Sequence, residues 1–155
     1  MGQEIERKFL VVGDDWRDLG TATLYRQGYI PTLDTRTVRV RIAGEQGYLT
    51  LKGPPVGNVR PEFEYPIPVE EAAEILDTLC DPPLIEKKRY RVPIADLVWE
   101  IDEFLGDNAG LIVAEVELPQ ADYAFSLPEW IGLEVTDDPR YLNANLAKLP
   151  FSQWS

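Results

Sequence analysis

Residues 3–9 read QEIERKF and place a charged residue at every second position near the start of the chain. On a β-strand, residues two apart point to the same face and lie about 6.5 Å from each other. Such a strand presents Glu4, Glu6 and Lys8 together on one face. Two carboxylates this close repel each other unless a cation joins them, and a lysine beside that cation suits a bound anion. The stretch therefore predicts half of a site for a metal ion and a phosphate.

The length and composition favour one soluble domain. The chain has 155 residues, enough for one hydrophobic core and few for two, so we expect a single domain over 1–155. Its hydrophobic content of 45% is typical of globular proteins, and no apolar stretch approaches the length of a transmembrane helix. The charged N-terminus argues against a signal peptide. Because Cys80 is the single cysteine, no internal disulfide can form, and we expect a cytoplasmic protein.

The net charge and the absence of histidine limit the partners and the chemistry. A formal net charge of −12 argues against nucleic acid and membranes as partners, but clustered lysines and arginines can still bind a small polyanion. Without histidine, hydrolysis must use carboxylates, lysine, tyrosine or metal-bound water. The commonest zinc ligand is also missing, so Mg²⁺ or Mn²⁺ are the remaining metal candidates.

Alternation with a period of two predicts a mostly antiparallel β domain. A short amphipathic helix is expected from Pro68 to before Asp81, with further helices over 121–126 and 141–148. Because eight strands can close on themselves and so remove unpaired edges, we expect a mainly β (α+β) fold. This fold is a closed eight-stranded antiparallel barrel with a few short outer helices and a C-terminal helix. The expected strands cover 3–12, 22–31, 36–43, 46–53, 59–67, 84–93, 97–105 and 110–118.

Charged residues share one face of most of these strands. The ordinary interpretation is a solvent-exposed face of half-buried strands. However, solvent faces usually mix uncharged polar residues with charges, and here the signs also segregate by strand. Like charges two apart cost energy unless a ligand or a metal lies between them. We therefore favour a charged interior that binds a ligand. The like-charged pairs are Glu4/Glu6, Arg39/Arg41, Lys87/Arg89 and Glu115/Glu117.

Charged motifs follow one another in a fixed order along the chain. They are Glu4-x-Glu6-x-Lys8, Arg39-x-Arg41, Lys52, Arg60-x-Glu62-x-Glu64, Lys87-x-Arg89 and Glu115-x-Glu117. This ordered set, over roughly residues 3–148, resembles the CYTH superfamily, the triphosphate tunnel metalloenzymes, and within it the short inorganic triphosphatase branch. The resemblance implies an antiparallel β tunnel, lined by charges from every strand, in which a triphosphate binds together with Mg²⁺ or Mn²⁺.

Within such a tunnel the charged residues divide into three groups. Arginine forks and lysine point charges suit phosphates, whereas carboxylates suit a hard cation. The expected substrate-binding residues are Lys8, Arg39, Arg41, Lys52, Arg60, Lys87 and Arg89. The expected metal ligands are Glu4, Glu6, Glu115 and Glu117, with Asp102 as a further candidate. The lumen-lining residues Glu62 and Glu64 have two open roles, orienting arginines or binding metal.

Hydrolysis also needs a group that positions the attacking water or accepts its proton. Lys87 lies among other cations, Arg89 and Arg91, which should lower its pKa. The alternative for Lys87 is a plain phosphate clamp. Tyr29 resembles a tyrosine that partners such a lysine in the inorganic triphosphatase branch, and its alternative is an aromatic residue of the outer core. We name Lys87 and Tyr29 as the catalytic candidates.

Taken together, the sequence predicts a metal-dependent phosphohydrolase that cleaves inorganic triphosphate to pyrophosphate and phosphate. Its partner would be this small molecule, and the sequence leaves a homodimer open. The alternatives are a class IV adenylate cyclase, or a thiamine or nucleoside triphosphatase. A further alternative is a module that binds polyphosphate without cleaving it.

Overall fold

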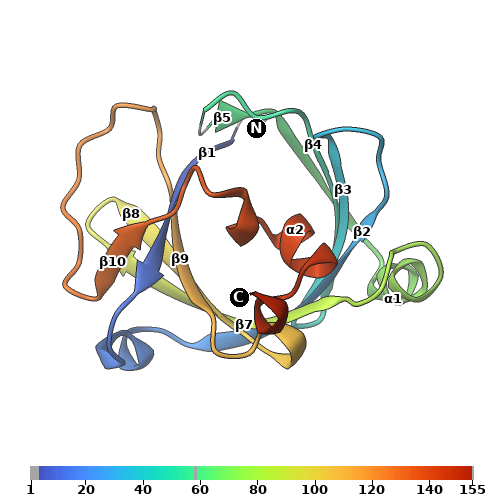
Figure 1. The fold of residues 1–155 in the computed structure, drawn as a ribbon, viewed down its shortest axis with the longest axis horizontal. Helices are drawn as coiled ribbons and strands as arrows, with labels where there is room; N and C mark the ends of the chain where they lie inside the picture. The colour runs from blue at the N-terminus through green and yellow to red at the C-terminus, as the bar shows by residue number, and fades with distance from the viewer. Residues whose placement is uncertain (1–3, 58, 155) are drawn as a thin grey trace.

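The computed structural model describes residues 4–57 and 59–154, except for the side chain of Glu4. Its strands curve into a ring, with the C-terminal residues lying across it in Figure 1. The sheet has ten strands in the order β10-β1-β9-β8-β7-β2-β3-β4-β6, and β5 pairs with β1 off this path. The strands are β1 (Glu4–Val11), β2 (Ala22–Ile30), β3 (Thr37–Ala43), β4 (Gln46–Lys52), β5 (Val59–Arg60), β6 (Glu62–Ile67), β7 (Ile85–Ile94), β8 (Leu97–Phe104), β9 (Ile112–Glu117) and β10 (Ile131–Glu134).

The predicted closed eight-stranded barrel is wrong in its strand number and in its closure. The expected strand 59–67 is divided at Pro61, which has no N–H to donate to a ladder. One edge of β1 pairs with β9, and the other is shared between β5 and β10. Within the described residues, β6 pairs with β4 and reaches β1 only through the two residues of β5. The wall is therefore continued by the chain itself at Pro61, and hydrogen bonds do not close the ring.

The helices also differ in part from the prediction. α1 (Val69–Thr78) is confirmed, and Figure 1 shows it outside the ring. Residues 121–126 are not helical; instead Tyr123 and Phe125, two apart, both pack on a hydrophobic cluster as extended chain does. The expected helix 141–148 is shorter, with α2 at Asn143–Lys148. No helix in the described ranges is long and apolar enough to cross a membrane. The 3-10 helices, which the sequence did not predict, are η1 (Asp15–Leu19), η2 (Gly106–Asn108), η3 (Pro139–Tyr141) and η4 (Phe151–Gln153).

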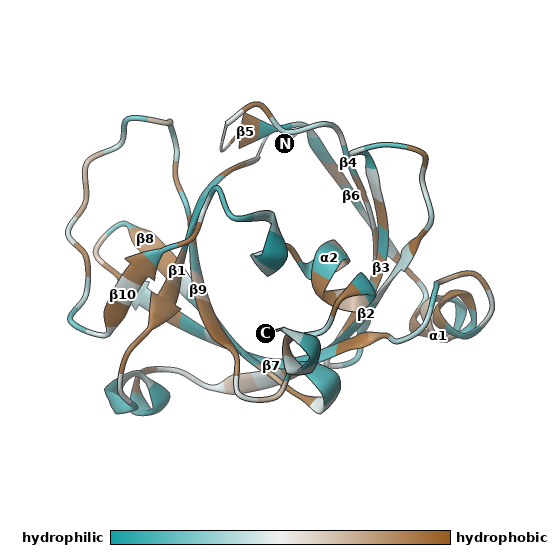
Figure 2. Ribbon diagram, in the orientation of Figure 1, coloured by the Kyte–Doolittle hydropathy of each residue, from teal (hydrophilic) through white to brown (hydrophobic). Residues whose placement is uncertain are grey.

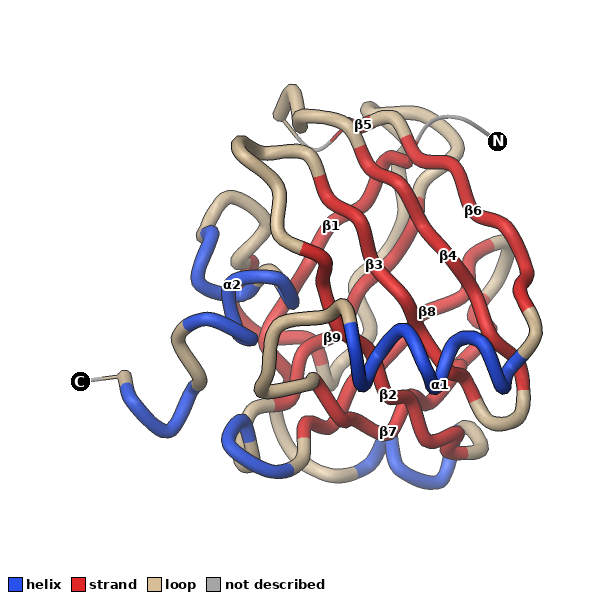
Figure 3. Tube along the Cα trace, turned by 90° about the vertical axis from the view of Figure 1, so that its right-hand side faces the viewer, coloured by secondary structure: helices blue, strands red, loops and turns tan. Residues whose placement is uncertain are grey.

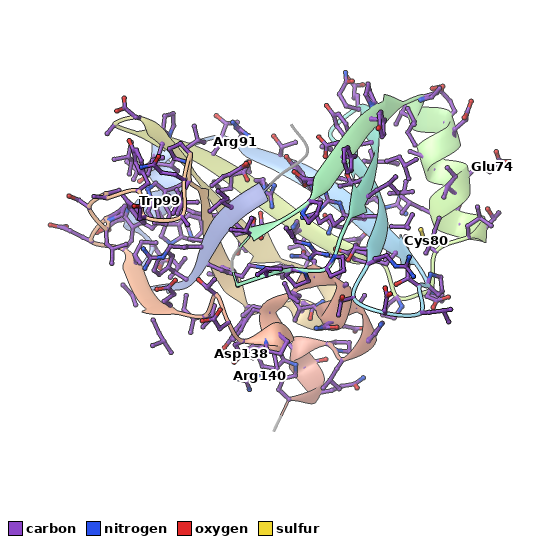
Figure 4. The ribbon with its side chains drawn as sticks, turned by 90° about the horizontal axis from the view of Figure 1, so that it is seen from above. Glu74, Cys80, Arg91, Trp99, Asp138 and Arg140 are labelled. Atoms are coloured by element: carbon purple, nitrogen blue, oxygen red, sulfur yellow. The ribbon has the colours of Figure 1, made fainter. Side chains whose placement is uncertain are left out.

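Much of the hydrophobic packing lies on the outside of the ring. Trp99 on β8 centres one cluster, in which it contacts the rings of Phe9, Phe125 and Trp130. A second cluster packs α1 against β3 and β4 and includes Cys80. Figure 4 shows Trp99 and Cys80 on opposite flanks of the molecule. Figure 2 shows hydrophilic and hydrophobic residues alternating along the strands, as expected when one face packs outward and the other faces a polar interior.

The C-terminal segment covers one end of the ring. Figure 3 shows α2 and the residues after it at that end, and Figure 4 shows Asp138 and Arg140 there as well. Leu146 of α2 and Tyr141 of η3 pack with Ile85, Phe104 and Val113, which continue the inward faces of β7, β8 and β9. This third cluster forms an apolar floor beneath the charged part of the interior.

Because Trp99 is 1% exposed at the centre of the outer cluster, we expect Trp99→Ala to destabilise the protein by about 3–5 kcal/mol. Urea unfolding followed by circular dichroism measures this free energy. The matched control is Leu133→Ala, since Leu133 is 71% exposed and its truncation should change stability by less than about 0.5 kcal/mol. Equal effects for the two variants would contradict the outer position of the core.

Candidate active site

Alternate residues of the strands line a charged cavity of about 810 Å³. Residues that are paired directly across two antiparallel strands point their side chains to the same face of the sheet. The strand register therefore places charged side chains from different strands next to each other. Glu6 lies opposite Glu117, and Lys8 lies opposite Glu115. Of the residues that the sequence singled out, the cavity is lined by Glu6, Lys8, Tyr29, Arg39, Arg41, Lys52, Arg60, Glu62, Glu64, Arg89, Glu115 and Glu117.

Three of the predicted site residues are not among the lining residues. The backbone of Glu4 pairs with Arg60, but its side chain lies outside the described residues. Lys87 and Asp102 share the inward faces of β7 and β8 with Arg89 and Phe104 but are fully buried, next to lining residues. Because both groups are buried, the pKa of each depends on the charge of the other and on the charges of the nearby lining residues.

The acidic part of the wall comes from β1 and β9. Burial raises the pKa of Glu115, but the charges of Lys8 and Arg89 and a hydrogen bond with Glu6 outweigh it and hold this pKa well below its usual range. Likewise, burial lowers the pKa of Lys8, but Glu115 and Glu6 outweigh it and raise that pKa. The Lys8 ammonium also donates to the carbonyl oxygen of Tyr141 at 3.3 Å. Within the described ranges, no three acidic or cysteine side chains converge to bind a metal unaided.

The basic part of the wall is centred on Arg39 and Arg41 of β3. The Nη2 of Arg39 donates to the Thr50 hydroxyl at 3.1 Å and lies 3.5 Å from Glu64. Arg39 is 6% exposed, and its buried Nε has no hydrogen-bond partner among the described residues. Burial and the nearby charges of Arg39 and Arg89 lower the pKa of Arg41 to about 9. Crowded guanidinium groups with an unused donor suit a multiply charged anion.

A buried ion cluster lies inside the ring, beside the cavity that Arg89 lines. Arg89 donates hydrogen bonds to both carboxylate oxygens of Asp102, from Nε to Oδ1 at 2.7 Å and from Nη2 to Oδ2 at 2.8 Å. Lys87 Nζ lies 2.8 Å from the same Oδ2 and donates to Asn143 of α2 at 2.9 Å. Burial raises the pKa of Asp102, but Arg89 and Lys87 outweigh it and lower that pKa to about 2. Burial is the dominant effect on Lys87, and with Arg89 and Arg41 it lowers the pKa of this lysine to about 7.

The remaining candidates form local contacts around the mouth of the cavity. Lys52 lies 3.5 Å from Glu62 across β4 and β6. Arg60 donates to the carbonyl oxygens of Gly53 and Thr35 at 3.0 and 3.2 Å. These contacts hold the side chains of Lys52 on β4 and Arg60 on β5 where they line the cavity.

The sequence analysis missed uncharged members of the site. On β2, Tyr25 and Gln27 share the inward face with Tyr29, and the period of two could have identified both. Tyr25 stacks under the guanidinium groups of Arg41 and Arg89 at 4.9 and 4.8 Å. Nothing local in the sequence indicates that Asn143, more than fifty positions from Lys87, would contact it.

Comparisons with known proteins show what this chain is similar to. A model of the CYTH domain matches residues 2–147. The inorganic triphosphatase of Acetivibrio thermocellus is 53% identical over 154 residues and the match covers 99% of each chain. That of Nitrosomonas europaea is 39% identical over 148 residues, covering 93% of this chain and 96% of the relative.

Solved structures share the fold. A crystal structure of an inorganic triphosphatase is similar with a TM-score of 0.63 and 36% identity, covering 92% of this chain and 96% of that one. A protein of Pyrococcus horikoshii is similar with a TM-score of 0.59 and 18% identity, covering 77% of this chain and 80% of that one, which shows the fold alone. The family match over nearly the whole chain and the identity to the two triphosphatases show that this chain belongs to the CYTH domain family.

Proposed function

We propose that this chain is a hydrolase that cleaves inorganic triphosphate to pyrophosphate and phosphate. The observation that carries the proposal is the cavity that Arg39, Arg41 and Arg89 line together, in which a buried Arg39 N–H has no hydrogen-bond partner in the part of the chain that the structure describes. A linear triphosphate carries negative charge along its whole length, so cations from several strands can bind all its phosphates at once. The two inorganic triphosphatases that cover nearly the whole chain support the same substrate.

In this proposal a divalent metal ion, Mg²⁺ or Mn²⁺, binds at the acidic part of the wall. Glu6 and Glu115 are in hydrogen-bonding contact, and Glu117 lies directly opposite Glu6. Such oxygen donors suit a hard cation that keeps phosphate oxygens and water in its shell, which explains why the protein need not supply a complete ligand set. When bound, this ion would neutralise phosphate charge and polarise the bond to be cleaved. We assign the ion to Glu4, Glu6, Glu115 and Glu117.

Asp102 has a different role in the proposal from the one that the sequence suggested. Both of its carboxylate oxygens accept from Arg89, and one also contacts Lys87. An anion so occupied holds the two cations in place instead of binding the metal. Glu64, whose carboxylate accepts from Thr50 beside Arg39, likewise orients an arginine, and we give Glu62 the same role towards Lys52.

The cations bind the substrate and stabilise the transferring phosphoryl group. Lys8, Arg39, Arg41 and Arg89 surround the middle of the cavity, and Lys52 and Arg60 hold the phosphate nearest the rim. Catalysis is then mainly electrostatic, because groups fixed before binding need no reorganisation as charge develops. We propose Lys87 as the acceptor of the proton of the attacking water, since a lysine with a pKa of about 7 is partly neutral at physiological pH. A cytoplasmic location also belongs to this proposal.

The first test is an activity panel. We expect phosphate release from inorganic triphosphate with Mg²⁺ or Mn²⁺. ATP and thiamine triphosphate should react more slowly, because all the proposed binding contacts are made to phosphates and none to a base or a thiamine group. Cyclic AMP and pyrophosphate from ATP would instead identify the adenylate cyclase alternative. Binding of intact triphosphate for hours, measured by calorimetry, would identify a non-catalytic module. Folded protein without release with either metal would contradict the proposal.

The second test concerns the unpartnered guanidinium. We expect Arg39→Ala to raise the KM for triphosphate at least about 10-fold, because a buried charge-assisted hydrogen bond to phosphate is lost. The matched control is Arg26→Ala on the adjacent strand, whose arginine is paired with Glu86 outside the cavity. Steady-state kinetics of both variants measure the effect, and an unchanged KM for Arg39→Ala would argue against phosphate binding here.

The third test uses pH. Lys87 faces Asp102 on β8, Arg89 on its own strand, Arg41 on β3 and Glu115 on β9. Because its pKa is lowered to about 7, the neutral base form is gained as pH rises, so kcat should rise through pH 7 and then level.

Lys87→Met should lower kcat about 10²- to 10⁴-fold and remove this step from the pH profile. A variant that raises KM but keeps the pH step would show that Lys87 is a phosphate clamp. The unpaired Asp102 is a structural risk of the substitution, so circular dichroism must accompany the kinetics.

A further inference from the structure

Gln27 is a fully buried polar side chain that joins two residues of the cavity wall. It is 0% exposed and lies on β2 directly opposite Arg41 of β3. Its Oε1 accepts from Arg41 Nε at 2.9 Å, and its Nε2 donates to the Tyr29 hydroxyl at 2.7 Å. Both Arg41 and Tyr29 line the cavity. The side chain therefore connects a phosphate-binding cation to a catalytic candidate without reaching the cavity itself.

The chemistry of Arg41 determines the direction of this chain of hydrogen bonds. A guanidinium group has only donors, so the atom that faces Arg41 must be the amide oxygen of Gln27. The opposite orientation of the amide would place two donors against each other in a buried site. The NH₂ group of Gln27 must then face Tyr29, and the tyrosine oxygen must accept.

This direction decides where the proton of Tyr29 points. A phenol has one proton, and the lone pair facing Gln27 is occupied by the amide N–H. The proton is therefore turned away from Gln27, and none of the described residues accepts it in a hydrogen bond. Tyr29 lies beside the cavity and directly opposite Arg39, which places this free donor next to the proposed phosphates.

We infer that Gln27 is a positioning residue that makes Tyr29 a hydrogen-bond donor to a phosphate oxygen of the substrate, not an acceptor of the proton of water. The inference rests on the proposed function. It separates two roles that the sequence left joined, because proton acceptance falls to Lys87 alone and Tyr29 stabilises phosphate charge. It also explains why position 27 requires glutamine, whose side chain accepts from Arg41 and donates to Tyr29.

Two substitutions of Gln27 alter the hydrogen bonds in different ways. Gln27→Glu keeps an acceptor for Arg41, but a carboxylate only accepts, so Tyr29 must donate to it and the proton leaves the cavity. Gln27→Met is neutral and of similar size, and it frees the hydroxyl without reversing it. We therefore expect kcat to fall in the order Gln, Met, Glu, with a loss of about 10- to 100-fold for Gln27→Glu.

The experiment measures kcat and KM for triphosphate in a double-mutant cycle with Tyr29→Phe. If Gln27 acts through Tyr29, Gln27→Glu should lower kcat little further once residue 29 is phenylalanine, and the Met variant should then equal the Glu variant in kcat. The carboxylate that Gln27→Glu introduces also weakens phosphate binding, but this effect appears in KM and is thereby separated from the effect on kcat. Leu24→Ala, on the outer face of β2 and half exposed, is the control for effects of the strand.

Losses in kcat that multiply in the double variant, with the wild type active, would overturn this inference and leave the proposed function standing. An order with Met below Glu would overturn it in the same way. A folded wild-type chain that neither hydrolyses triphosphate nor binds it in calorimetry would overturn the proposed function and this inference with it. Thermal unfolding of every variant identifies one that fails to fold, and the remaining Gln27 variant then completes the cycle.

Discussion

A charge buried away from water must have an opposite charge or a hydrogen-bond partner, and this constraint shapes the interior of the ring. Asp102 is the clearest case, since Arg89 and Lys87 both bind it, and Asp102 and Lys87 are only 1% and 0% exposed. Towards the cavity the compensation is incomplete. The Nε–H of Arg39 has no acceptor among residues 4–57 and 59–154, and Glu6 and Glu115 are in contact although both are acids. The charges around Asp102 are therefore compensated within the protein, whereas Arg39 at the cavity has a donor that the described residues leave unused.

This division explains the unusual distribution of hydrophobic residues. An ordinary small β domain buries apolar side chains between its sheets, but here the interior holds charges. Apolar packing is moved outward, to the Trp99 cluster on one flank and to the contact of α1 with β3 and β4 on the other. The interior becomes apolar only where the C-terminal segment covers one end, around Leu146 and Phe104.

The sequence predicted what depends on local alternation and missed what depends on distant neighbours. The strands through Arg39/Arg41 and Glu115/Glu117 were recognisable because like charges two apart must share a face. Ring closure was not, because it depends on which strands meet at β1 and on the break at Pro61. The segment 121–126 was expected to be helical, but Tyr123 and Phe125 pack on the outer cluster, a contact with distant residues that the local sequence does not indicate. Gln27 and Asn143 are uncharged, so a search for charge patterns passed over them although both contact predicted residues.

The alternation along each strand has a consequence for substitutions in this molecule. Successive positions serve two separate purposes, one towards the cavity and one towards the outer clusters, so the parity of a residue number within a strand decides which property a substitution affects. Arg41 and Gln27 face inward, whereas their neighbours Val40 and Gly28 pack against α1 and the residues after it. Along the charged part of each strand, a substitution at an inward position therefore alters the cavity, and a substitution at an outward position alters the packing of the outer clusters.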